Sequence, residues 1–179
     1  MKMKKLILGS AILAVMGMSA NAMAAANSGS VNFSGSVSTA TCNLAVKDNA
    51  GADITSVDLG VLSSTATTDG TAVNFKLVPQ ETTCLTKQNA TMVWTSPTLT
   101  ATGFSNASAD GTNATMSLTA SNSSATDKVV KQGNTSFNYT ATGGIKSYDF
   151  SAQLKRPATG TTMTAGPFSA TASYVVAYK

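Results

Sequence analysis

Cys42 and Cys84 are the residues of this 179-residue chain whose chemistry is clearest. An isolated pair of cysteines in an exported protein most often forms a disulfide, and we expect one between these two. It would enclose a loop of 84 − 42 = 42 residues, for which loop-closure entropy gives a stabilisation of about 4 kcal/mol. Two free thiols are the alternative. A zinc site is disfavoured because the chain contains no histidine, and two cysteines do not complete a tetrahedral ligand set.

The sequence shows none of the common arrangements of catalytic residues. Without histidine, a Ser-His-Asp arrangement is excluded. Glu81 is the single glutamate, no pair of carboxylates stands out, and no glycine-rich phosphate loop is present. We therefore expect a protein that is not an enzyme and that binds neither a cofactor nor a metal.

Sugar binding has two sets of candidate residues. Lys128, Lys155 and Arg156 could grip an acidic sugar, although a group of charges is more often a solvated surface. Trp94 could serve as a stacking platform for a sugar ring. Its place in an apolar strand beside Val93 favours a core position instead.

Residues 1–26 are predicted to be a signal peptide. Three lysines among the first five residues precede a short apolar stretch at residues 6–18, and small-x-small cleavage matches follow at residues 22–26. The apolar stretch is short for a membrane span, which makes a retained anchor the weaker alternative. The exported chain would begin at Asn27. It keeps 9 of the 12 basic residues and all 8 acidic ones, so no basic surface argues for a nucleic-acid partner.

The elements that must position these residues are all predicted to be strands. An extended run at residues 31–46 breaks near Gly35 and Thr41, and no segment after the leader has helical periodicity. Short strands at this spacing indicate a single β-sandwich domain. The other segments with apolar alternation are residues 56–61, 71–78, 90–95, 112–120, 136–140, 146–155 and 167–179.

Both ends of the exported chain alternate with a period of two. At the carboxyl end, one face of a long strand carries Phe168, Ala170, Ala172, Tyr174, Val176 and Tyr178. At the amino end, Gly29, Val31, Phe33 and Gly35 form a second alternating run. Because chain termini normally fray unless something holds them, two such ends suggest a domain whose edges are completed by other chains.

Five features, in order behind a signal peptide, resemble the pilins of the bacterial chaperone–usher pathway, especially the major subunits of FanC-like fimbriae. The features are the segment GSVNFSGSV at residues 29–37, the cysteine pair about forty residues apart, VDLG at residues 57–60, FSAQL at residues 150–154, and a terminal strand with Gly166 fourteenth from the end and Tyr178 penultimate. The resemblance covers the whole exported chain.

The resemblance implies an incomplete immunoglobulin-like β-sandwich that lacks its last strand, which leaves a groove along the terminal strand. A periplasmic chaperone would fill the groove first. The extension of the next subunit, residues 27–36 with Gly29, Val31, Phe33 and Gly35, would then replace it at an outer-membrane usher, by strand addition at a sheet edge. Residues 37–179 would form the pilin domain. The alternative reading is that the extension is the ordinary first strand of its own domain.

The resemblance assigns the groove and chaperone-binding strand to Gly166, Phe168, Tyr174, Val176 and Tyr178. The expected function is that of a major structural subunit of an adhesive fimbria on the bacterial surface, with identical subunits, the chaperone and the usher as partners. The second candidate is an adhesin subunit that itself binds a host glycan.

Overall fold

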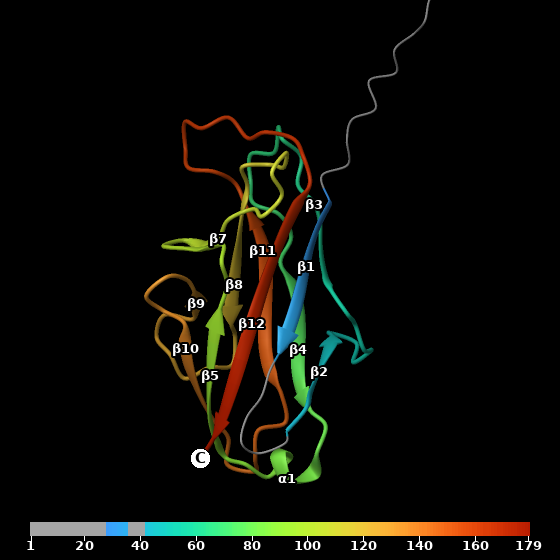
Figure 1. The fold of residues 1–179 in the computed structure, drawn as a ribbon, viewed down its shortest axis with the longest axis vertical. Coiled ribbons are helices and arrows are strands. Elements are labelled where there is room, and N and C mark those ends of the chain that lie inside the picture. The colour runs from blue at the N-terminus through green and yellow to red at the C-terminus, as the bar shows by residue number, and fades with distance from the viewer. Residues whose placement is uncertain (1–27, 36–41) are drawn as a thin grey trace, which may run out of the picture.

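The computed structural model describes residues 28–35 and 42–179. The predicted signal peptide of residues 1–26, its cleavage site before Asn27, and residues 36–41 lie outside this part of the chain. Two sheets face each other along the long axis of the molecule, and the C-terminus lies at the same end as the short helix α1 (Thr82–Leu85) (Figure 1).

The first sheet has five strands, in the spatial order β10 (Ser136–Thr140), β5 (Asn89–Thr95), β12 (Phe168–Tyr178), β1 (Ser28–Gly35) and β3 (Val57–Val61). The path of the second sheet runs through β2 (Leu44–Asp48), β4 (Val73–Pro79), β11 (Tyr148–Lys155), β8 (Thr115–Ala120), β7 (Gly103–Phe104) and β6 (Leu99–Thr100), and β9 (Val129–Val130) pairs with β8. The fold is therefore the expected all-β sandwich.

Alternation in the sequence places one face of each long strand in the core. In β11 the buried residues Tyr148, Phe150, Ala152 and Leu154 alternate with half-buried ones, as a strand with a period of two requires. The ring of Phe150 stacks on Phe75 within its own sheet, with centroids 5.4 Å apart, and meets the edge of Trp94 from the opposite sheet at 5.1 Å. These aromatic contacts join the two sheets.

One outer edge of each sheet is covered by the chain itself. At β10, the backbone N–H of Ser124 donates to the carbonyl of Asn138 over 2.8 Å. At β2, Ile54 donates to the carbonyl of Val46 over 2.9 Å. Covered edges leave fewer unpaired backbone groups to template association with other chains.

The predicted strands are all present, and their boundaries differ from those of the structure by three residues at most. Residues 136–140 match β10, and Pro79 ends β4 as expected. The helix α1 and the two-residue strands β6, β7 and β9 were not predicted, because segments of two to four residues are too short to show a period. Within the described part of the chain, no helix is long and apolar enough to cross a membrane.

Buried tyrosines predict a loss of stability in alkali. Burial raises the pKa of Tyr139, Tyr148 and Tyr174 above the usual value of 10.0, so the folded chain holds protons that the unfolded chain releases. Below about pH 10 these tyrosines are protonated in both states and do not lower the free energy of unfolding. Above about pH 10, the three residues together lower the free energy of unfolding by up to about 4 kcal/mol per pH unit. Tyrosinate absorbance and the β-sheet circular dichroism signal should change together as pH rises. Ionisation of these tyrosines near pH 10 with the β-sheet signal intact would contradict this expectation.

Candidate strand-pairing site

Strand β1 lies between β12 and β3 and joins them (Figure 1). It runs parallel to β12 over seven residues, with Gly29 opposite Phe168 and Gly35 opposite Tyr174. It runs antiparallel to β3, with a register irregularity between Ser28 and Ser30. Among the described elements, β1 is the only one that pairs with β3. Removing β1 from the sheet would open a groove between β12 and β3.

The two walls of this groove are strands that turn apolar residues to the core. On β12 the buried residues are Phe168, Ala170, Ala172, Tyr174 and Val176, whereas Tyr178 is half-buried. The prediction that these alternate residues share one face is confirmed. On β3, Val57 and Leu59 are buried. The backbone register places Val31 and Phe33 of β1 opposite Ala170 and Ala172.

The edge of β12 that faces away from β1 has its own partners. Its second half pairs with β5 from Ser173 to Tyr178. In the first half, Ala107 donates its N–H to the carbonyl of Ser169 over 2.8 Å, and the Ser96 hydroxyl donates to the carbonyl of Thr171 over 2.7 Å. The strand position beside β12 that remains is the one that β1 occupies. Along the edge that faces β1, the backbone N–H and C=O groups of β12 therefore depend on an added strand for their hydrogen-bond partners.

Gly166 sets the start of β12. Its φ of +150° lies in a region that other residues rarely adopt, and an added Cβ would come within 2.8 Å of the carbonyl carbon of Gly111. The residue after it, Pro167, accepts hydrogen bonds from the Asn106 amide at 2.8 Å and the Thr112 N–H at 3.2 Å. Gly166 therefore lets the chain approach the loop at residues 106–112 closely before it enters the strand.

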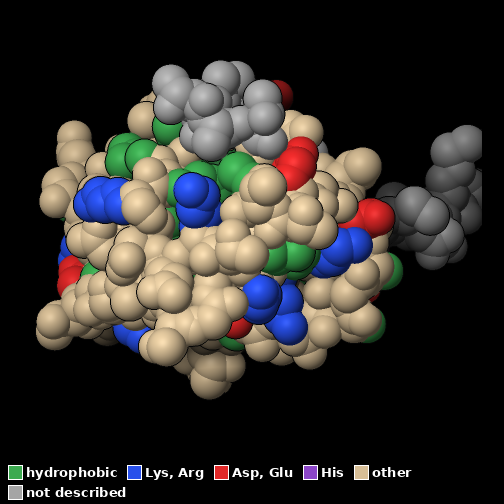
Figure 2. Space-filling model, turned by 90° about the horizontal axis from the view of Figure 1, so that it is seen from below, with side chains coloured by type: hydrophobic (Ala, Val, Ile, Leu, Met, Phe, Trp, Pro, Cys, Tyr) green, Lys and Arg blue, Asp and Glu red, His purple; other side chains and the backbone are tan. Residues whose placement is uncertain are grey.

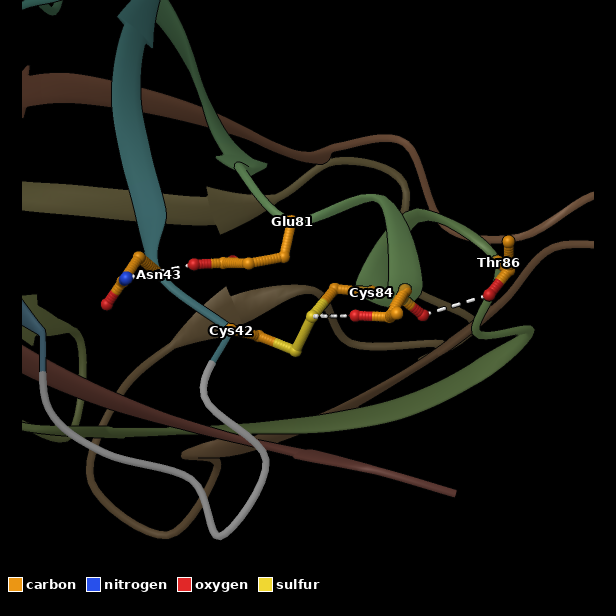
Figure 3. Close-up of a disulfide and its surroundings, with 6 residues drawn as sticks. Cys42, Asn43, Glu81, Cys84 and Thr86 are labelled. Carbon is orange, nitrogen blue, oxygen red and sulfur yellow. Dashed lines mark hydrogen bonds between the residues drawn. A yellow bond between two sulfur atoms is a disulfide. The ribbon is translucent and has the colours of Figure 1, made fainter.

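The expected disulfide joins Cys42 to Cys84 (Figure 3). Cys84 is buried in α1, with 2% of its surface exposed. Beside the disulfide, the Asn43 side-chain amide donates to a Glu81 carboxylate oxygen over 2.9 Å (Figure 3). The chain segment that leads out of β1 is thus anchored covalently at Cys42, seven positions after Gly35.

The three cations considered for sugar binding do not converge. Lys155 forms an ion pair with Asp69, with Nζ and Oδ2 2.9 Å apart, and the N–H of Arg156 donates to the same carboxylate. These bonds hold the pKa of Asp69 below its usual value, with the Arg156 N–H as the largest cause. Lys128 donates instead to the carbonyl of Ser121 over 2.8 Å. The Lys155 and Arg156 pair therefore ties one loop to the end of β11.

Distance along β8 separates Lys128 from this pair. Lys155 lies opposite Thr115, at the start of β8, whereas the carbonyl of Lys128 accepts from Ala120, at the other end. Five residues of strand span about 17 Å. In the view from the end that carries α1, basic and acidic side chains are also interspersed over the surface (Figure 2).

Trp94 belongs to the core, with 1% of its surface exposed. It packs against Phe150 and, with centroids 5.4 Å apart, against Tyr174 of β12. A stacking platform for sugars needs an accessible ring face, which this side chain does not offer.

Comparison with known proteins decides the family. No protein-family model matches the sequence. The K99 fimbrial protein of Escherichia coli is 35% identical over 166 residues, which cover 87% of this chain and 89% of that protein. The chain belongs to this family of fimbrial subunits. The crystal structure of the P pilus rod subunit PapA aligns with a TM-score of 0.49 at 21% identity, over 78% of this chain and 100% of that one. The resemblance to chaperone–usher fimbrial subunits is confirmed by the K99 relative, and the fimbrial subunit is a structural component of a fimbria on the bacterial surface.

Sequence reasoning found one wall of the groove of this fimbrial subunit and missed the other. The long alternation at residues 168–178 identified β12. The segment at residues 57–60 was predicted as a strand, but its place beside β1 depends on pairing between residues about thirty positions apart. The anchoring roles of Asp69 and Asn106 carried no recognisable motif, because each depends on a loop conformation. The roles of the predicted extension and chaperone-binding residues stay predictions.

Proposed function

We propose that this fimbrial subunit polymerises by strand donation: residues 27–36 of one copy leave their own domain and fill the groove between β12 and β3 of another copy. The role is structural, and no enzymatic step is involved. The single observation that carries the proposal is that one strand, β1, closes the gap between β12 and β3, while the outer edges of β10 and β2 are covered by the domain's own loops.

The pairing of β1 within its own chain supports this reading. Seven positions of β1 pair along β12, and a strand of this length and register would span the groove. A strand from a second copy with the same sequence can make the same kinds of contact. Each backbone hydrogen bond contributes about 0.5–1.5 kcal/mol, and each buried Val or Phe side chain about 1.5–3 kcal/mol, so one strand supplies enough free energy for a stable junction.

The chaperone and the usher would act on the same groove before donation. An open groove exposes core residues and unpaired backbone, which favours aggregation. A chaperone strand laid along β12 would protect Phe168, Tyr174 and Val176, which are buried side chains of the core. The chaperone strand would then bind the backbone edge of β12. Gly166 fixes where that edge begins, and Tyr178 lies near its end.

Host-glycan binding by the subunit itself gains no support from the described residues. The predicted cations lie at opposite ends of β8, and Trp94 is enclosed in the core. We therefore develop only the polymerisation role.

Photo-crosslinking tests the proposal in assembled fibres. A photoreactive residue in place of Ser30 lies in the centre of the extension. After irradiation of purified fibres, we expect a ladder of covalent oligomers under denaturing conditions. Mass spectrometry should locate the crosslinks in β12 or β3 of a second copy. The contacts are intermolecular in a fibre built by donation, because each extension occupies the groove of another copy.

A matched control uses the same photoreactive residue at Thr161, which is exposed in the loop between β11 and β12. This position should give no ladder of the same kind. If assembled fibres carry only intramolecular crosslinks from position 30 to β12, the extension is the permanent first strand of its own domain and the proposal is wrong.

A further inference from the structure

We infer that the Cys42–Cys84 disulfide carries the tension of a stretched fibre past the edge strand β2 and delivers it to β5. The inference rests on the proposed strand donation. When the extension of one subunit is held in the groove of another, a pull on the fibre acts on the chain that leaves the extension. The first residue after β1 that the structure describes is Cys42, and the disulfide anchors it to Cys84.

Two covalent routes lead from Cys42 into the domain. The route along the backbone enters β2, which lies at the edge of its sheet and pairs with β4 over five residues, from Leu44 to Asp48. All five residues of β2 are only half-buried. Its other edge meets only the short segment at residues 52–54. A half-buried strand with one strand partner resists displacement less than a strand held on both sides, because fewer hydrogen bonds and less apolar area must be lost.

The route through the disulfide enters the better-held part of the fold. Cys84 is followed after five positions by Asn89, the first residue of β5. Strand β5 is paired on both sides, with β10 over five positions and with β12 over six. Its alternate residues Ala90, Met92 and Trp94 are buried. Displacing β5 would break two ladders and expose core residues.

The short connection between α1 and β5 is itself fixed. The N–H of Ile145 donates to the carbonyl of Lys87 over 2.7 Å, and the N–H of Ala141 donates to that of Gln88 over 2.9 Å. The Lys146 ammonium group donates to the carbonyl of Leu85 over 2.8 Å. These bonds hold the chain between Cys84 and β5 against the turn that joins β10 to β11.

The disulfide also shortens the path along which tension crosses the domain. Tension would enter at Cys42 and pass through Cys84 to β5. Strand β12, next to β5, pairs with whichever strand fills the groove. Strand β3 also borders the groove. The route through β12 crosses one six-residue ladder, and β2 stays outside this route while the disulfide is intact.

Force spectroscopy on purified fibres tests this route. Wild-type fibres are stretched with and without a reducing agent, and thiol alkylation confirms cleavage. In reduced fibres we expect subunits to unfold at lower force. Each unfolding should also release additional length, because the sequence separation of 42 corresponds to about 140 Å of extended chain. C42S/C84S fibres, where they assemble, should behave as reduced wild-type fibres do.

The decisive comparison uses the substitution Val46→Ala in β2. The side chain of Val46 packs against the core. With the disulfide intact, Val46→Ala fibres should unfold at the wild-type force, because β2 carries no tension. After reduction they should unfold at a lower force than reduced wild-type fibres. Equal weakening by Val46→Ala in both states would overturn the inference, as would an unfolding force that reduction leaves unchanged.

The crosslinking experiment separates this inference from the proposed function. Intramolecular crosslinks at position 30 in assembled fibres would mean that strand donation fails, and the tension route fails with it. Intermolecular crosslinks combined with an unfolding force that is insensitive to reduction would leave strand donation standing and reject only the tension route.

Discussion

Deleting Ser28–Gly35 should abolish fibres on the cell surface. The deleted chain has no strand with which to fill another subunit's groove, and its own β12 and β3 lose the element that joins them. Because polymer length depends on every junction, even a partial loss at each junction shortens fibres sharply. Electron microscopy of cells that express only the deleted subunit should show no fibres, and periplasmic extracts should contain the subunit bound to its chaperone.

Paired substitutions separate donation from a general loss of the N-terminal strand. Val31→Asp with Phe33→Asp places charges at the alternate positions predicted to enter the groove, where burying a charge is costly. Asn32→Asp with Ser34→Asp adds the same charge at the positions between them. We expect fibres to be lost in the first variant and retained in the second. Normal fibres from the deleted chain, or equal loss in the two charge variants, would contradict strand donation at this register.

The strands of the fold could be predicted because their information is local. Residues 148–155 alternate so regularly that both the strand and its buried face follow from the sequence. The disulfide was also predictable, because the chain holds one pair of cysteines. The groove could not be predicted in full from local patterns. Its second wall, β3, pairs with β1 although the two strands are about thirty residues apart in the sequence, and no local pattern indicates such a pairing.

The charged residues show the limit of sequence reasoning most clearly. Lys128, Lys155 and Arg156 form a basic set only if the fold brings them together. The length of β8 holds Lys128 away from the other two, and Asp69 neutralises Lys155 locally. Asp69 lies 86 positions before Lys155, so the ion pair that changes the interpretation could not be read from neighbouring residues.

Trp94→Ala should cost about 3–5 kcal/mol of the free energy of unfolding, the usual range for removing a buried tryptophan. The side chain is almost fully enclosed. It contacts Phe150 of the opposite sheet and Tyr174 of β12, so its loss leaves a cavity at the point where the two sheets meet behind the groove. Urea unfolding of the monomeric subunit, followed by circular dichroism, would measure the change.

Val93→Ala is the matched control, since it lies next to Trp94 on the same strand but faces outward with 38% of its surface exposed. Surface substitutions of this kind change the free energy of unfolding by about 0.5 kcal/mol or less. If Trp94→Ala lowers the free energy of unfolding strongly and Val93→Ala changes it little, the inward-facing side chains of β5 are the ones that stabilise the fold. That face also supports β12, so Trp94→Ala should lower fibre yield as well. Comparable unfolding curves for the two variants would show that the sandwich does not depend on the Trp94, Phe150 and Tyr174 contacts.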